Sequence, residues 1–204
     1  MANVKKVVYE DLPNQAQEVR KAAQEMNNEF QSIYKSVDNL RENWYGQRYN
    51  DLLTSLNNAS ADFNSIIDLM QRELPYTLET IANNYSRVDR GQNIVRPDNT
   101  KPQKIASIPY SDEFGIKFQT TEIEQTKSKC ISSFASIEGA LNNMQGMIDN
   151  MSWESSSSDK FKSEYQELKT KITDTINGIK SQFDKSVVQT IADYKITDIP
   201  NINT

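Results

Sequence analysis

Histidine is absent from this chain of 204 residues, and cysteine occurs once. The missing histidine removes the commonest general base and the commonest metal ligand of proteins. The single Cys130 has no second cysteine for an internal disulfide and no histidine for a protease-like dyad, so we interpret it as a small buried residue on a helix face. The sequence therefore favours a protein that is not an enzyme and has no catalytic site, metal site or cofactor.

Glycine and proline are also scarce, with six of each. Hydrophobic residues make up 36% of the chain and charged residues 25%, which is too apolar for a disordered chain and too polar for a thick globular core. Amphipathic helices in a bundle fit this composition. The net charge of −5, with no basic stripe, argues against a nucleic-acid partner.

Long apolar runs are missing as well. The N-terminal "MANVKKVVYEDL" lacks the apolar stretch of a secretory signal peptide. No window approaches the roughly 20 apolar residues of a membrane span, so we expect no stable membrane insertion. With neither signal, the protein would not leave by the ordinary export routes and is expected to stay in the cytoplasm, where it is made.

Apolar residues recur at steps of three and four in the first 90 residues, which predicts two long helices. Asp11 and Pro13 suit a helix start, Gly46 separates the two stripes, and Pro75 is expected to kink the second helix. The first stripe comprises Val19, Ala23, Met26, Phe30, Ile33, Val37 and Leu40, and the second Leu52, Leu56, Ala59, Phe63, Ile67, Met70, Leu74, Leu78, Ile81 and Tyr85.

Residues 90–119 contain three of the six prolines and form a predicted linker. Its apolar residues Ile105, Ile108, Tyr110, Phe114 and Phe118 are available to contact a neighbouring surface. Helical periodicity returns near Thr120 and continues to Trp153; a serine run then offers N-cap candidates for a fourth helix. We therefore divide the chain into a hairpin at 1–89, a linker at 90–119 and a second hairpin at 120–204.

The two halves match each other at a shift of 109 residues. Trp44 then falls on Trp153, Tyr85 on Tyr194 and Asp89 on Asp198, without an insertion. Apolar stripes coincide easily by chance, but two rare tryptophans at the same distance from a Tyr-x-x-x-Asp motif do not. The chain thus reads as two tandem helical hairpins.

A hairpin of long helices needs a sharp reversal, and Gly46 permits backbone angles that other residues avoid. The tryptophan two residues earlier is expected to cover the end of the bundle, with its N–H free to reach a partner. In the simplest interpretation each tryptophan only closes the bundle end.

Trp44-Tyr45-Gly46 in the turn and Tyr85…Asp89 after the second helix resemble the WXG family of small early-secreted-antigen-like proteins, exported by type VII secretion systems. The resemblance covers residues 10–90 and 120–198. It implies helical hairpins that pair antiparallel, so that the tryptophan turn of one lies near the Tyr-x-x-x-Asp tail of the other. The secretion ATPase is thought to recognise that composite.

Carried over to this chain, the resemblance pairs Trp44 and Gly46 with Tyr194 and Asp198 as one composite signal. Trp153 with Tyr85 and Asp89 forms the other. The second turn departs from the family pattern because Ser155 stands where glycine is expected. This departure suggests that one end of the molecule is the functional one.

The linker length favours an antiparallel arrangement. Crossing a helix of 30–40 residues requires about 45–60 Å, and a linker of roughly 30 residues reaches ~100 Å at most. A parallel arrangement needs only a few residues. We therefore predict an all-α fold in which the two hairpins pack antiparallel as a four-helix bundle, an intramolecular pseudo-dimer.

The resemblance implies a virulence-associated protein that is made in the cytoplasm, secreted without a classical signal peptide, and active as an effector or adaptor through protein–protein interaction. Its expected partners are the type VII secretion ATPase and another WXG-like protein or a second copy. Two alternatives stay open: a cytosolic coiled-coil scaffold, and a membrane-active helical toxin.

Overall fold

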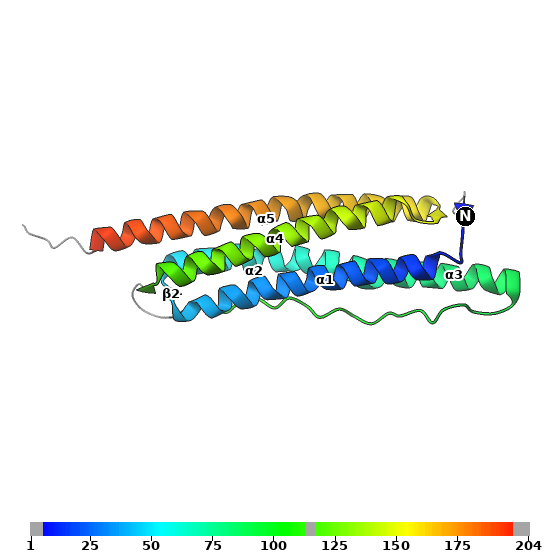
Figure 1. Cartoon of the computed structure of the whole chain (residues 1–204), viewed down its shortest axis with the longest axis horizontal. Helices are drawn as coiled ribbons and strands as arrows, with labels where there is room; N and C mark the ends of the chain where they lie inside the picture. Colours follow the sequence, from blue (N-terminus) through cyan, green and yellow to red (C-terminus); the bar gives the residue numbers. More distant parts are fainter. Residues whose placement is uncertain (1–5, 113–116, 198–204) are drawn as a thin grey trace, which may run out of the picture.

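The computed structural model describes residues 6–112 and 117–197. In these residues, two helical hairpins lie side by side along most of their length, with α5 projecting at one end and α3 at the other (Figure 1). The first hairpin consists of α1 (Leu12–Asn39), the 3₁₀ turn η1 (Leu40–Glu42), β2 (Trp44–Tyr45), α2 (Gln47–Asp68), the π-helical turn η2 (Leu69–Glu73) and α3 (Leu74–Arg90). The second consists of α4 (Thr120–Asp149), β4 (Trp153–Glu154) and α5 (Ser156–Thr197), and the short strands β1 (Lys6–Val7) and β3 (Lys117–Phe118) precede α1 and α4.

The helices form where the apolar stripes predict them. α1 starts beside Asp11 and Pro13 as expected, although the Asp11 side chain makes no capping hydrogen bond. α1 ends at Asn39, before Trp44, and the chain tightens into η1 so that the reversal starts earlier than the apolar stripe suggests. α4 begins at Thr120, the position at which periodicity returns.

Pro75 disrupts the second helix in a specific way. The backbone widens into the π-helical turn η2 immediately before it, and a regular helix resumes at Leu74. Pro75 thus occupies the first turn of α3, where proline is best tolerated. A π turn is a usual way for a long helix to absorb such a break.

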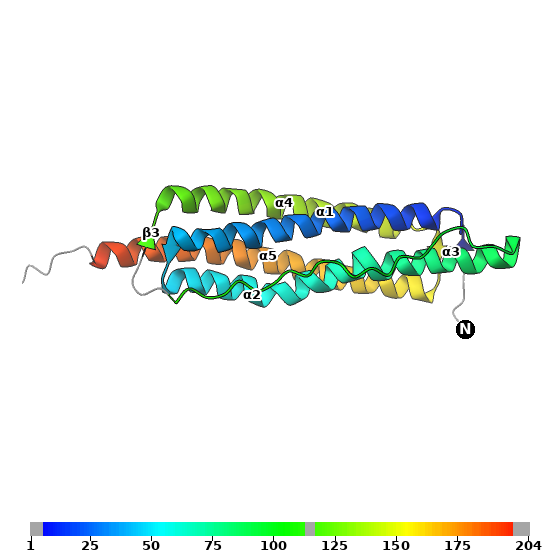
Figure 2. The same ribbon diagram turned by 90° about the horizontal axis from the view of Figure 1, so that it is seen from below.

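The hairpins pack antiparallel, as predicted. β2, at the end of α1, pairs with β3, at the start of α4, through Trp44↔Phe118. At the opposite end, β1 precedes α1 and pairs with β4 in the second turn, through Val7↔Trp153. α1 therefore packs on α4 and α2 on α5 in opposite directions, and the two turns lie at opposite ends of the bundle (Figure 2).

The core is a single cluster of apolar side chains along the bundle axis. Three buried tyrosines tie the helices of each hairpin together by donating hydroxyl hydrogen bonds to carbonyls across the pair. Tyr34 bonds to Leu56, Tyr49 to Val37 at 2.9 Å, and Tyr165 to Leu141 at 2.5 Å. Burial raises the pKa of Tyr49 to about 12 and raises the pKa values of Tyr34 and Tyr165 further, so all three stay neutral donors.

The linker runs along the first hairpin without regular secondary structure through residues 92–112 (Figure 2). Ile105 and Ile108 are buried, which confirms their predicted role in contacting a neighbouring surface. Phe118 packs against Trp44, whereas Tyr110 stays half exposed. Phe114 lies outside the described residues.

Cys130 lies on the inner face of α4 and is 2% exposed, as predicted. Burial raises the pKa of its thiol to about 12. Since the thiolate is the reactive form, we expect no labelling by a thiol reagent such as Ellman's reagent at pH 7–8 in the native state and one equivalent after denaturation. Rapid stoichiometric labelling without denaturant would contradict this packing of α4.

Candidate recognition sites at the two ends of the bundle

The Trp44 turn (residues 43–46) is built around a fully buried indole. Rings from three elements surround Trp44, with centroid distances of 5.6 Å to Tyr49 of α2, 6.1 Å to Phe118 of β3 and 6.0 Å to Phe183 of α5. Trp44 thus connects its own hairpin to two parts of the second hairpin: β3, where that hairpin begins, and the C-terminal half of α5. Aromatic pairs of this kind add to the stabilisation that burial alone provides.

Gly46 follows the strand pair and precedes α2. Its backbone adopts φ 113° and ψ −177°, a region that is essentially reserved for glycine because a Cβ would clash with the backbone. The sequence prediction that Gly46 permits the reversal is therefore confirmed, and the reason is its conformation.

The Trp44 indole N–H does not make the hydrogen bond that the sequence led us to expect. We expected it to reach a hydrogen-bond partner, but the Trp44 Nε1 is buried and none of the described groups accepts its hydrogen. The three surrounding rings offer no strong acceptor, which explains this result. The tryptophan therefore acts as an apolar plug in this turn.

The C-terminal part of α5 lies at the same end of the bundle, which we call the Trp44 pole. Arg48, two residues after Gly46, donates to Asp193 of α5 at 2.9 Å, and the pair raises the Arg48 pKa. Tyr194 is 48% exposed and lies about 16 Å farther along α5 than Phe183, by ~1.5 Å per residue. Asp198 lies outside the described residues, so its part in the site stays a prediction.

The Trp153 turn (residues 150–155) forms the opposite end, the Trp153 pole. Trp153 is 4% exposed and its ring lies 6.1 Å from Phe161. The segment before α1 holds this turn through strand pairing and through the Val8 N–H, which donates to the Ser152 carbonyl at 2.9 Å. Sequence reasoning did not anticipate this use of the N-terminal segment.

At the second turn, around Ser155, the chain reverses without a residue of positive φ. Among the described residues, positive φ occurs only at Gly46 and Gly91. The Ser155 hydroxyl accepts hydrogen bonds from the N–H groups of Ser157 and Ser158, both at 3.2 Å, and caps α5. Ser158 in turn accepts the N–H of Ser155 at 2.8 Å. The pair forms a reciprocal cap that replaces the glycine of the first turn, so the predicted serine N-cap is confirmed.

Tyr85 and Asp89 lie near the end of α3 at the Trp153 pole. Asp89 accepts a hydrogen bond from Tyr9, a contact that raises the Tyr9 pKa, while Glu10 pairs with Arg90. Tyr85 is 38% exposed. The N-terminal segment thus bridges the Trp153 turn and Asp89; this link depends on strand pairing across some 146 residues, which no local sequence signal reveals.

Residues 5–90 match the family model of WXG100, described as proteins of 100 residues with WXG. The first hairpin is therefore similar to the WXG100 family over its whole length. This confirms the resemblance drawn from the Trp44 turn and places it on a chain with a second helical hairpin. Searches of curated proteins and of solved structures gave no match.

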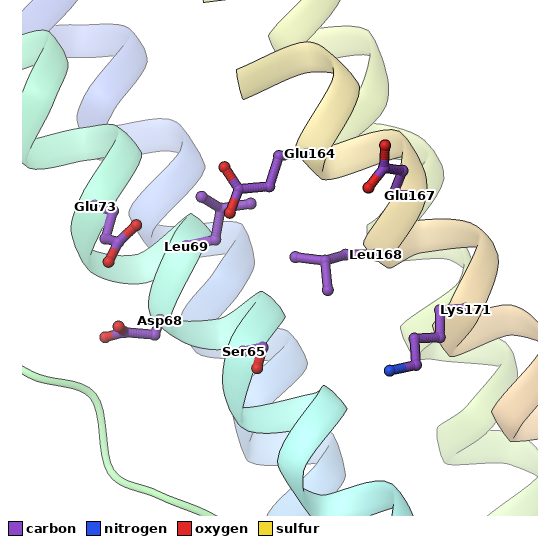
Figure 3. A pocket seen from close by; sticks show the side chains of 8 residues that line it. All are labelled: Ser65, Asp68, Leu69, Glu73, Glu164, Glu167, Leu168 and Lys171. Carbon is purple, nitrogen blue, oxygen red and sulfur yellow. The ribbon is translucent and has the colours of Figure 1, made fainter. Parts of the chain in front are cut away.

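A cleft of about 510 Å³ separates the first hairpin from α5 of the second (Figure 3). Carboxylates from both helices line it, but Asp68 and Glu73 pair with Arg72, and Lys171 pairs with Asp62 at 2.7 Å. Arg72 also lowers the pKa of Asp68. Glu164 and Glu167 of α5 line the cleft as well, so its lining is mainly acidic, and we assign it no chemistry.

The described residues contain no group of three or more potential metal ligands. Within the same ranges, none of the helices is both long and apolar enough to cross a bilayer.

Replacing Gly46 by Ala is expected to destabilise the protein by about 1–3 kcal/mol, because the φ of 113° strains any side chain. Gly139→Ala provides the matched control: Gly139 lies inside α4, and a Cβ there meets nothing within 4 Å. That change is expected to stabilise the fold by about 0.5–1 kcal/mol.

Urea unfolding followed by circular dichroism measures both variants against the unmodified chain. Equal stability of Gly46→Ala and the parent would show that the first turn tolerates a side chain, contrary to the observed backbone geometry.

Proposed function

We propose that this chain is a substrate of a type VII secretion system and leaves the cell as a folded pseudo-dimer. Its export signal is the composite of Trp44 and Gly46 in the first turn with Tyr194 near the end of α5 and Asp198 of the following sequence. Outside the cell the protein acts without catalysis, as an effector or adaptor that binds other proteins.

One observation carries this proposal: the antiparallel packing brings a WXG100 turn to the end of the bundle at which the other hairpin's last helix finishes. The Arg48–Asp193 ion pair joins the two next to Tyr194, with 2.9 Å between Nε and Oδ2. A separate partner hairpin is not needed for this juxtaposition, because the second half of the same chain supplies it.

One feature favours the Trp44 pole over the Trp153 pole. The Trp44 turn has the glycine of the family motif, whereas the Trp153 turn is closed by the Ser155 cap. A secretion ATPase that reads a Tyr-x-x-x-Asp tail beside a tryptophan turn would therefore act at Tyr194 and Asp198.

The partners follow from the same arrangement. The secretion ATPase is the proposed receptor for the Trp44 pole, and another WXG-like protein or a second copy would bind the outer faces of the bundle. Both hairpins already bury their main apolar faces against each other, so we expect the single chain to suffice for recognition.

Changing Tyr194 to Ala is expected to reduce export at least tenfold, because a half-exposed ring on the part of α5 that extends past the Trp44 turn is then lost to the receptor. The measurement is the ratio of secreted to cell-associated protein in the native host, by immunoblot. Since Tyr194 lies at the helix end, its loss should leave the thermal unfolding temperature nearly unchanged.

Tyr85→Ala is the matched control, since Tyr85 occupies the equivalent repeat position at the Trp153 pole and is 38% exposed. We expect it to be exported normally. Undiminished secretion of Tyr194→Ala would reject the proposed signal and favour a cytosolic scaffold, and equal loss in both variants would show that both poles are read.

A further inference from the structure

Three asparagines on α2 bind the linker backbone in one repeated geometry. Asn50, Asn57 and Asn64 each accept the N–H of one linker residue at Oδ1 and donate from Nδ2 to the C=O of the same residue. The partners are Ser111 at 3.0 and 3.1 Å, Ile108 at 2.8 and 2.9 Å, and Ile105 at 2.8 and 3.0 Å, for the N–H and the C=O respectively. We call these side chains the asparagine ladder. In these six hydrogen bonds each amide side chain contacts main-chain atoms of the linker, as a neighbouring β-strand would.

The spacing of the ladder matches an extended ligand. Seven helical residues rise about 10.5 Å, and three extended residues cover about 9–10 Å. Positions seven residues apart on α2 therefore lie opposite positions three residues apart in the linker, for all three pairs. The next step pairs position 71 with position 102, where Pro102 has no N–H; there Gln71 turns instead to Gln24.

The same linker positions carry the apolar contacts. Ile105 and Ile108 are 4% and 5% exposed, while Ala106 and Ser107 between them face solvent. α1 forms the second wall, where Asn27 donates to the Gln103 carbonyl at 3.0 Å and Gln31 to the Lys104 carbonyl at 3.1 Å. The α1/α2 groove thus buries the side chains of Ile105 and Ile108 and satisfies the polar backbone around them.

The ladder is not a remnant of the internal repeat. At the shift of 109 residues, Asn50, Asn57 and Asn64 correspond to Asp159, Gln166 and Thr173 of α5. Asparagine is also a poorer helix former than alanine, so three of them at heptad positions in one helix lower its intrinsic stability. Their presence on α2 alone fits a binding role.

We propose that the α1/α2 groove is a peptide-binding site in its own right. Its ligand is an extended segment with the pattern Ile-x-x-Ile, in which both isoleucines retain a backbone N–H. Residues 101–112 of the linker are the copy of this ligand carried in cis, and the groove binds the same segment in trans once the cis copy is released.

The test uses the full chain with Ile105→Pro and Ile108→Pro, which removes both the apolar contacts and the N–H donors of the resident segment. The probe is a fluorescein-labelled peptide of residues 101–112, followed by fluorescence anisotropy. We expect saturable binding to this variant and at least tenfold weaker binding to the unmodified chain, whose groove is occupied.

Two comparisons isolate the backbone reading. A peptide with N-methyl-isoleucine at both positions keeps the side chains but lacks the N–H groups, and is expected to bind at least tenfold more weakly. Adding Asn57→Leu to the variant chain should have a similar effect, whereas Asn58→Leu, an exposed neighbour, should have none. The N-methyl comparison uses the double-proline variant without any further substitution, so it stands even if Asn57→Leu fails to fold.

Absence of binding to the opened variant, confirmed as folded by circular dichroism, would overturn the proposal. Equal affinity for the N-methylated peptide would also overturn it, since the ladder would then contribute nothing to recognition.

Discussion

The mutual burial of two apolar hairpin faces, in opposite directions, is the constraint on which the rest of this molecule depends. Neither hairpin has enough apolar cover by itself, because each helix contributes only one stripe to the core. The antiparallel direction brings each turn against the beginning or end of the other hairpin's helices. The Trp44 plug, formed by rings from α2, β3 and α5, exists only because of that direction.

The antiparallel direction also determines the path that the linker must take. A connection between antiparallel hairpins must travel the length of the bundle, and an extended chain has unpaired N–H and C=O groups at every residue. The asparagine ladder satisfies three of these residues without a β-sheet, and Asn83 extends the principle near the start of the linker by bonding to both polar groups of Val95. The linker consequently packs as part of the first hairpin.

The two poles solve one geometric problem with different chemistry. Gly46 reverses the chain through a left-handed backbone, whereas Ser155 does so through a hydrogen-bonded cap. The N-terminal segment then adds a bridge to the Trp153 pole through Val7 and Tyr9. The repeat is therefore only approximate in structure, and the outer surfaces of the two ends differ.

Helix positions, the linker and the WXG100 character of the first hairpin could all be predicted from the sequence, because they rest on local periodicity and on a motif in contiguous residues. Pro75 marked the helix disruption but not its π-helical form, and the N–H of Trp44 was wrongly assigned a partner. The seven-residue spacing of Asn50, Asn57 and Asn64 is visible in the sequence, but nothing in α2 alone indicates that the linker packs on them.

The sequence by itself determined four amphipathic helices and the two sharp reversals between them, since each depends on residues within a few turns of one another. Only the tertiary structure decided which segments meet: Tyr9 with Asp89, Arg48 with Asp193, and the ladder with every third linker residue. Those contacts join residues 41 to 145 positions apart, and the packing of the two faces, not local preference, determines their distances.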